Sequence, residues 1–436
     1  MSAVKNTNVV NAGSTSNASD TEEKLLLPLP KWKIWYIMVV IFILLFFDLA
    51  TRSVVGPLFP LIKKEFGLLD YQLGLLSTVT MGTVMILAIP LSYLIDRWRR
   101  GKMMSLMAIL WSVASIISGL ANGFAMLLTG RAVLGVAEAS YNSAGQTMIM
   151  ATIKKRLRTT ITGFLYTGMT LGMAGGLVLG GWLGASYGWR NTLIILAIPG
   201  IIFGIIAWFM PDYKNLPRPA GGPSETSSKG FGEMIKSFLI NKSVMLMVIA
   251  YAFILFIIYT IVSWLPTYLI RFAGMDVSTA GTMSGLVILI GLFAMPLGGW
   301  LGDLAARKSA RAKITVILSS AIIAVVGAIC ALLFNVWPLF IFTSIGVNLL
   351  IPAQQVTLQE LVPSHQRASV FGFYYTGTLI LGGLWAPFAI GAISDASDLK
   401  IAFWVGVGIA TISVILYPLV YKFFNNDYAR ARQQEQ

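Results

Sequence analysis

Long apolar runs separated by short polar segments dominate the chain from residue 33 onward. A helix that crosses a bilayer needs about 20 mostly apolar residues, and about twelve runs in this chain reach that length. Because lipid offers backbone groups no hydrogen-bond partner, the pattern predicts an all-α membrane protein. The predicted spans are 33–58, 71–95, 103–121, 123–151, 159–185, 191–210, 244–271, 277–303, 313–333, 336–361, 366–393 and 399–423.

Polar segments divide the chain into five predicted parts. Residues 1–32 are mostly polar and rich in Ser and Asn, which predicts a disordered tail and not a signal peptide. Residues 211–243 are rich in Pro, Gly and Ser, which predicts a linker. This linker separates six spans at 33–210 from six spans at 244–424, and residues 425–436 form a second polar tail.

Basic residues set the predicted orientation. They cluster in the loops after the second, fourth and eighth spans, at residues 97–102, 154–158 and 307–313, and the loops of the other parity carry fewer. By the positive-inside rule, both termini and the linker are expected in the cytoplasm. The expected location is a bacterial inner membrane.

Composition excludes several function classes. The chain has 436 residues, of which 56% are hydrophobic and 11% charged, whereas soluble domains carry about 25% charged residues. Its net charge of +14 is scattered over short loops and forms no groove, so nucleic acid is not an expected partner. One cysteine, Cys330, and one histidine, His365, leave no pair for a disulfide and exclude most metal sites and any Ser/His/Asp or Cys/His catalytic set in the membrane. We therefore expect neither an enzyme nor a cofactor.

A motif recurs at the ends of the second and eighth spans. Asp96 and Arg97 follow a small-residue stretch after Pro90, and Asp303 and Arg307 follow a similar stretch in the second half. An aspartate at a helix C-terminus opposes the helix dipole and favours a cationic partner, so such a pair can act as a gate. The alternative is a solvated charge at the membrane edge.

The first and fourth spans carry four charges within apolar sequence. Asp48 and Arg52 are four residues apart, and Arg131 and Glu138 are seven apart, so each pair shares a helical face. Such charges cost about 2.5–3.5 kcal/mol each in a span, so they normally face a cavity or a partner. At about 1.5 Å per residue, Asp48 and Glu138 reach similar heights, which predicts one shared cavity. A static structural salt bridge is the alternative.

Neutral polar residues mark further candidate contacts. Neutral amides and hydroxyls in a cavity can hydrogen-bond a substrate, and hydrogen bonds between helices are an equal alternative. The candidates are Tyr141 and Asn142 in the fourth span, Gln354 and Gln355 in the tenth, and Tyr374 and Tyr375 in the eleventh.

These motifs resemble those of a known family. The Asp96-Arg97 loop resembles the signature of the major facilitator superfamily, and residues 131–141 resemble the spinster-like branch, as does Trp264-Leu-Pro266. The first- and fourth-span charges are also similar to those of the anion:cation symporter branch. The chain departs from the family pattern in that Thr51, not an aspartate, precedes Arg52. The resemblance implies twelve helices in two pseudo-symmetric six-helix bundles.

Taken with the resemblance, the charges predict a transporter that works by alternating access. The expected substrate is a small organic anion, bound by Arg52 and Arg131 and coupled to protons carried by Glu138 and Asp48. The alternative is a spinster-like cargo such as a lysophospholipid or sphingoid amphiphile. Expected partners are the substrate, protons and the lipid bilayer, with the protein a monomer. A channel is disfavoured because paired charges suit coupled transport.

Overall fold

The computed structural model describes residues 29–97, 99–153, 155–211, 235–363 and 366–433. For some helical residues, among them Asp96, Arg97, Tyr141 and Asn142, the backbone alone is described. All elements over these ranges are helical. They are α1 (Lys31–Ser53), α2 (Val55–Phe66), α3 (Asp70–Arg97), α4 (Arg100–Gly119), α5 (Phe124–Thr152), α6 (Lys155–Trp208), α8 (Lys242–Ala273), α9 (Val277–Ala306), η1 (Ala310–Ala312), α10 (Lys313–Leu333), η2 (Trp337–Leu339), α11 (Phe340–Glu360), α12 (Arg367–Thr378), η4 (Leu379–Gly383), α13 (Ala386–Ala396) and α14 (Leu399–Gln433).

The predicted spans coincide with these helices, and the protein is a multi-pass integral membrane protein. Ten helical stretches of the described residues are long and apolar enough to cross a membrane. One of them, 163–208, covers most of two predicted spans, 159–185 and 191–210, because α6 is broken at Gly188 by backbone angles of φ 78° and ψ 165°. A glycine tolerates such a positive φ without steric cost. With α5, which covers the predicted span 123–151, the twelve expected helices are accounted for.

Two spans differ in detail from the prediction. The first extends to Phe66 as α2, which packs on α6 and α8, and not to residue 58 as expected. The eleventh is not one helix, because the π-helical turn η4 separates α12 from α13. Residues 235–240, within the predicted linker, are helical, and the rest of the linker at 212–234 lies outside the described residues. The division into five parts stays a prediction.

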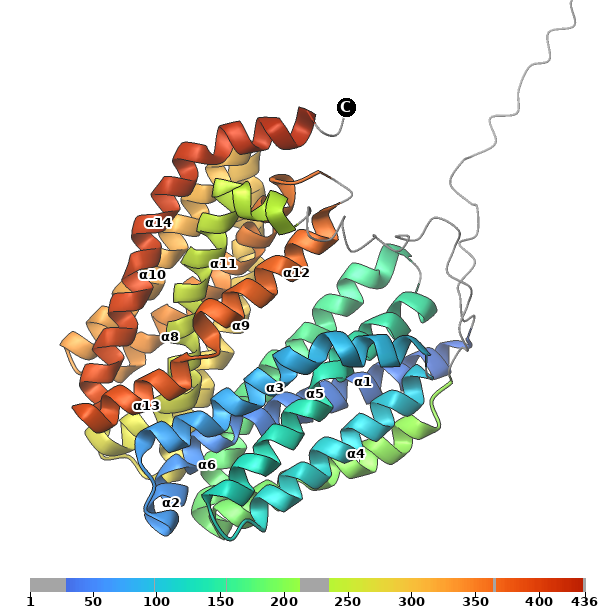
Figure 1. Ribbon diagram of the computed structural model, residues 1–436, viewed down its shortest axis with the longest axis vertical. Helices are drawn as coiled ribbons and strands as arrows, with labels where there is room; N and C mark the ends of the chain where they lie inside the picture. Colours follow the sequence, from blue (N-terminus) through green and yellow to red (C-terminus); the bar gives the residue numbers. More distant parts are fainter. Residues whose placement is uncertain (1–28, 98, 154, 212–234, 364–365, 434–436) are drawn as a thin grey trace, which may run out of the picture.

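The helices form two groups. Helices α1–α6 pack mainly on one another, as do α8–α14, and the groups meet through α2, α3 and α6 on one side and α8, α9 and α13 on the other. We call the end where α1 begins and α14 ends the terminal side, and the opposite end the far side. Figure 1 shows the two groups joined at α2, α3 and α13 and diverging toward the C-terminus.

Glycines bring the two halves into backbone contact near the far side. A Cβ atom on Gly74 of α3 would lie 2.1 Å from the carbonyl oxygen of Pro387 in α13. A Cβ atom on Gly181 of α6 would lie 2.9 Å from the Cα of Gly281 in α9. Small residues permit this approach of helix backbones in membranes. The far side is therefore closed.

Candidate functional site

A cavity of about 250 Å³ lies between the two halves. The first half contributes α1, α3, α5 and α6, and the second contributes α8, α12 and η4. Apolar side chains form most of its wall, and six polar side chains face one another across it. The lining residues are Leu45, Asp48, Leu49, Arg52, Met81, Val84, Met85, Ala88, Glu138, Ala139, Met169, Tyr259, Tyr375, Thr376 and Leu379.

Arg52 and Glu138 form an ion pair in the cavity wall. The Nε of Arg52 on α1 donates to Oε2 of Glu138 on α5 at 2.8 Å, and its Nη2 donates to the same oxygen. The Glu138 side chain is 2% exposed, and that of Arg52 is 24% exposed. Both residues line the cavity, and the arginine is the more exposed of the two.

Two buried carboxylate oxygens, one in this ion pair and one next to it, have no hydrogen-bond partner among the described residues. They are Oε1 of Glu138 and Oδ1 of Asp48, which lies one helical turn before Arg52 on α1. Both residues line the cavity and are nearly buried, at 6% and 7% exposed. Buried polar atoms are normally paired, so these two oxygens are places where a proton or a ligand would be stabilised.

Arg131 lies behind the cavity and does not line it. Its side chain is fully buried, and Nη1 and Nη2 donate to the backbone carbonyls of Thr51 and Arg52, each at 3.1 Å. These carbonyls belong to the last turn of α1, where a cation is favourable. Arg131 thus fixes the end of the helix that carries Asp48 and Arg52.

The other predicted contacts are divided between the cavity and the core. Tyr375 lines the cavity, whereas Gln355 does not. Gln354 is buried; it donates to the Met247 carbonyl and accepts from the Tyr417 hydroxyl, both at 3.0 Å. Tyr374 is buried in a ring stack with Tyr251. The side chains of Tyr141 and Asn142 lie outside the described residues.

Sequence reasoning missed Tyr259 of α8. Its side chain lines the main cavity and also a smaller cavity of about 30 Å³, toward the far side, which Arg52 borders as well. The Tyr259 ring packs on Gly383, where a Cβ atom would lie 2.8 Å from the ring. Gly383 belongs to the π-helical turn η4, a feature that often marks functional sites. A lone tyrosine in a long apolar run gave no signal in the sequence.

A polar cluster closes the far side, between these cavities and the far end of the protein. Asp70 at the start of α3 accepts two hydrogen bonds from Arg271 at the end of α8, both at 2.7 Å. Lys63 and Ser394 donate to the same carboxylate at 2.5 Å and 2.6 Å. Asp395 accepts from the backbone N–H groups of Asp70 and Tyr71, at 2.8 Å and 2.7 Å. Bidentate Arg–carboxylate pairs are among the stronger polar contacts, so this cluster ties the two halves together.

The four predicted gating residues lie toward the terminal side. Asp303 and Arg307, at the end of α9, are exposed, and no ion pair joins either of them to another described residue. The side chains of Asp96 and Arg97 lie outside the described residues. The halves diverge on this side, so the described conformation does not test the gate, which stays a prediction.

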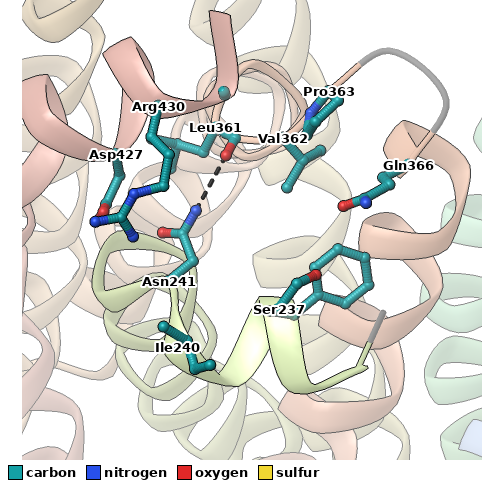
Figure 2. A pocket seen from close by; sticks show the side chains of 11 residues that line it. Ser237, Ile240, Asn241, Leu361, Val362, Pro363, Gln366, Asp427 and Arg430 are labelled. Atoms are coloured by element: carbon teal, nitrogen blue, oxygen red, sulfur yellow. Dashed lines mark hydrogen bonds between the residues drawn. The ribbon is translucent and has the colours of Figure 1, made fainter. Parts of the chain in front are cut away.

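Another pocket, of about 200 Å³, lies within the second half at the terminal side and contains none of the predicted site residues (Figure 2). Two of its polar side chains serve the fold: Asn241 donates to the Leu361 carbonyl at 3.0 Å, and Asp427 accepts from Ser243. Among the described residues no group of three or more His, Cys, Asp or Glu side chains could hold a metal ion.

Comparison with known proteins places this architecture in a family. The sequence profile of the Major Facilitator Superfamily matches residues 41–387. Protein spinster of Drosophila melanogaster is 23% identical over 385 residues, covering 83% of this chain and 62% of that protein. The probable galactarate/D-glucarate transporter of Bacillus subtilis (strain 168) is 23% identical over 301 residues, covering 63% and 66%. The chain thus spans less than two thirds of the length of these relatives.

The fold also matches solved structures. One is a crystal structure of a bacterial homolog of the human lysosomal transporter spinster, in an inward-facing and unoccupied conformation. It superposes with a TM-score of 0.82 at 20% identity and covers 92% of this chain and 99% of that one. Because the family profile covers most of the chain and the fold agrees with it, this protein belongs to the major facilitator superfamily.

Proposed function

We propose that the chain is a secondary active transporter that moves a small organic anion by alternating access, driven by protons. The observation that carries the proposal is the Arg52–Glu138 ion pair in the wall of a cavity between two halves. A titratable carboxylate and a permanent cation that share a buried site can exchange partners when one proton arrives. An ion pair with a purely structural role would not need to face a cavity.

The exchange follows from the geometry of the pair. One oxygen of Glu138 is engaged by Arg52 and the other is free of hydrogen bonds within the described part of the chain. A proton added to Glu138 cancels its charge, and when Asp48 is also protonated the Arg52 guanidinium is left uncompensated next to the cavity. A carboxylate or phosphate group of the substrate then replaces Glu138 as the partner of Arg52. Asp48, which also lines the cavity, is the second proton carrier.

Arg131 has a different role from the one that the sequence predicted. Because Nη1 and Nη2 of Arg131 donate to carbonyls at the end of α1, we assign anion binding to Arg52 alone and the positioning of Arg52 to Arg131. Tyr375 and Thr376 face the cavity from the second half and complete the site. Movement of the halves would then bring these hydroxyls and Arg52 together or apart.

Alternating access is supported by the asymmetry between the two sides. The far side is closed by backbone contacts at Gly74 and Gly181 and by the Asp70 cluster, and the halves diverge toward the terminal side. We infer from the distribution of basic loops that the terminal side faces the cytoplasm. The described conformation would then be open to the inside. Asp96 and Asp303, with Arg97 and Arg307, would close that side in the opposite state.

A second candidate substrate is an amphiphilic anion such as a lysophospholipid. The cavity lining is mostly apolar and includes Met81, Met85 and Met169, flexible side chains that adapt to varied apolar groups. The sphingosine-1-phosphate transporter of Danio rerio, 25% identical over 367 residues, supports this candidate, because its named substrate is an amphiphilic anion. Both candidates share the anionic group that Arg52 would hold.

Uptake into proteoliposomes tests the proposal. Binding of D-glucarate and of lysophosphatidic acid is first compared by thermal shift, and the ligand that stabilises the protein is used for transport. The wild type should concentrate that ligand in response to an imposed pH gradient, whereas Glu138→Gln should bind it and exchange it but not concentrate it. Glu360→Gln is the control, because Glu360 pairs with Lys313 outside the cavity. If Glu138→Gln still follows the gradient, Glu138 is not the proton carrier.

A further inference from the structure

Two basic side chains flank a surface pocket at the terminal end of the first half. The pocket has a volume of about 430 Å³ and is lined by Arg99, Lys102, Leu106 and Trp208. Arg99 precedes the first residue of α4, and Lys102 lies in the first turn of that helix. Trp208 is the last residue of α6, which packs along α4. The pocket therefore lies between the ends of two membrane-spanning helices.

Among the described residues, no carboxylate neutralises the charge in this pocket. No ion pair joins Arg99 or Lys102 to a carboxylate within the described ranges, and the first turn of α4 contains no acidic residue. The ammonium of Lys102 lies 4.8 Å from the centre of the Trp208 ring, a cation–π contact that holds it at the pocket. The N-terminus of α4 adds its positive dipole end. The pocket is thus suited to an anion.

Apolar surface continues from the pocket into the membrane. On α4, Leu106, Val113 and Ile117 are exposed, and their spacing of seven and four residues places them on one face. On α6, Ile205 is exposed one turn before Trp208, which is 46% exposed. Tryptophan at the end of a spanning helix is typical of the level of the lipid headgroups. A ligand with a negative head and apolar chains would match both parts of this surface.

We propose that this pocket binds the headgroup of an anionic membrane phospholipid, with its acyl chains against the exposed faces of α4 and α6. Arg99 and Lys102 hold the phosphate, and Trp208 packs on the glycerol region. The site is separate from the cavity between the halves, because the two share no residue. It binds a membrane component and so does not depend on the identity of the transported solute.

Native mass spectrometry of the purified full chain tests the proposal with phosphatidylglycerol as the probe. Wild-type protein should retain phosphatidylglycerol in preference to phosphatidylcholine. The double variant Arg99→Ala/Lys102→Ala should retain roughly fivefold less for each charge removed, as expected for basic residues near an anionic membrane surface. Lys308→Ala/Lys422→Ala is the matched control, because it removes two exposed charges from the terminal side of the second half.

Three results would decide between a specific lipid site, a diffuse charge effect and a soluble anion. Equal loss in both double variants would show a diffuse charge effect and overturn the proposal, as would unchanged retention in Arg99→Ala/Lys102→Ala. Displacement of the lipid by millimolar inorganic phosphate would identify a soluble anion as the occupant and also overturn it. Trp208→Leu keeps both charges, so a selective loss of phosphatidylglycerol in that variant would support the proposed contact between Trp208 and the headgroup. Melting temperatures without added lipid verify that each variant is folded.

Discussion

Arg271 of α8 and Asp70 of α3 form a bidentate pair that joins the two halves of the protein, with both hydrogen bonds at 2.7 Å. The Asp70 side chain is 2% exposed, and Lys63 and Ser394 donate to it as well. One carboxylate thus accepts hydrogen bonds from both halves at the far side. If the protein alternates between two states, this contact has to break when the far side opens.

Replacement of Asp70 by Asn should favour opening of the far side. The substitution removes the charge that holds Arg271 and Lys63, and a loss of about 1–2 kcal/mol would shift the two-state population by roughly 5- to 30-fold. Spin labels at the exposed positions Leu69 and Phe272, in a Cys330→Ser background, would report a longer distance between the halves. Glu65→Gln is the control, because Glu65 pairs with Arg190 inside the first half. An unchanged distance distribution would show that Asp70 does not hold the far side closed.

Replacement of Gly74 by Ala should be incompatible with the described conformation. The added Cβ would lie 2.1 Å from the Pro387 carbonyl oxygen, a backbone atom of the other half that cannot move alone. The variant should therefore populate the state with the far side open, measured with the same spin-label pair. Gly82→Ala is a matched control on α3, because its Cβ would lie 3.6 Å from a Leu384 methyl group, an ordinary contact. Equal behaviour of the two variants would contradict the packing argument.

Arg131→Ala should destabilise the first half of the protein. It removes both donors from the carbonyls of Thr51 and Arg52, and an unsatisfied buried polar group costs about 1–3 kcal/mol. The melting temperature should fall, and Arg131→Lys should restore part of it. Arg52→Ala should instead abolish anion-induced stabilisation. If Arg131→Lys loses anion binding without a change in melting temperature, Arg131 binds the anion directly.

Gln354→Leu should destabilise the second half and leave ligand binding intact. The amide joins the Met247 carbonyl to the Tyr417 hydroxyl in a fully buried position, so both partners would lose a hydrogen bond. Tyr375→Phe should instead weaken ligand binding and leave the stability unchanged, because Tyr375 is exposed to the cavity and its ring would remain. Thermal melts with and without the stabilising ligand measure both effects. A normal melting temperature for Gln354→Leu, with weakened ligand binding, would favour a substrate contact.

The sequence by itself determined the number and the approximate limits of the membrane spans. A run of about 20 apolar residues is long enough to cross the bilayer, and in lipid a single chain segment satisfies its backbone only as a helix. The signal is therefore local and does not depend on neighbours. The sequence also predicted one cavity for Asp48, Arg52 and Glu138. Helical rise fixes the height of each residue, and the cost of a charge in lipid directs the side chain inward.

Only the tertiary structure decided which charges face the cavity and which are used elsewhere. Arg131 and Glu138 share a helical face by spacing, yet Arg131 donates to the end of α1 and Arg52 takes the carboxylate. The choice depends on how α1 and α5 cross, and this angle is set by packing between helices and has no local sequence signal. The same holds for Asp70 and Arg271, which are 201 positions apart and meet only because the two halves close on the far side.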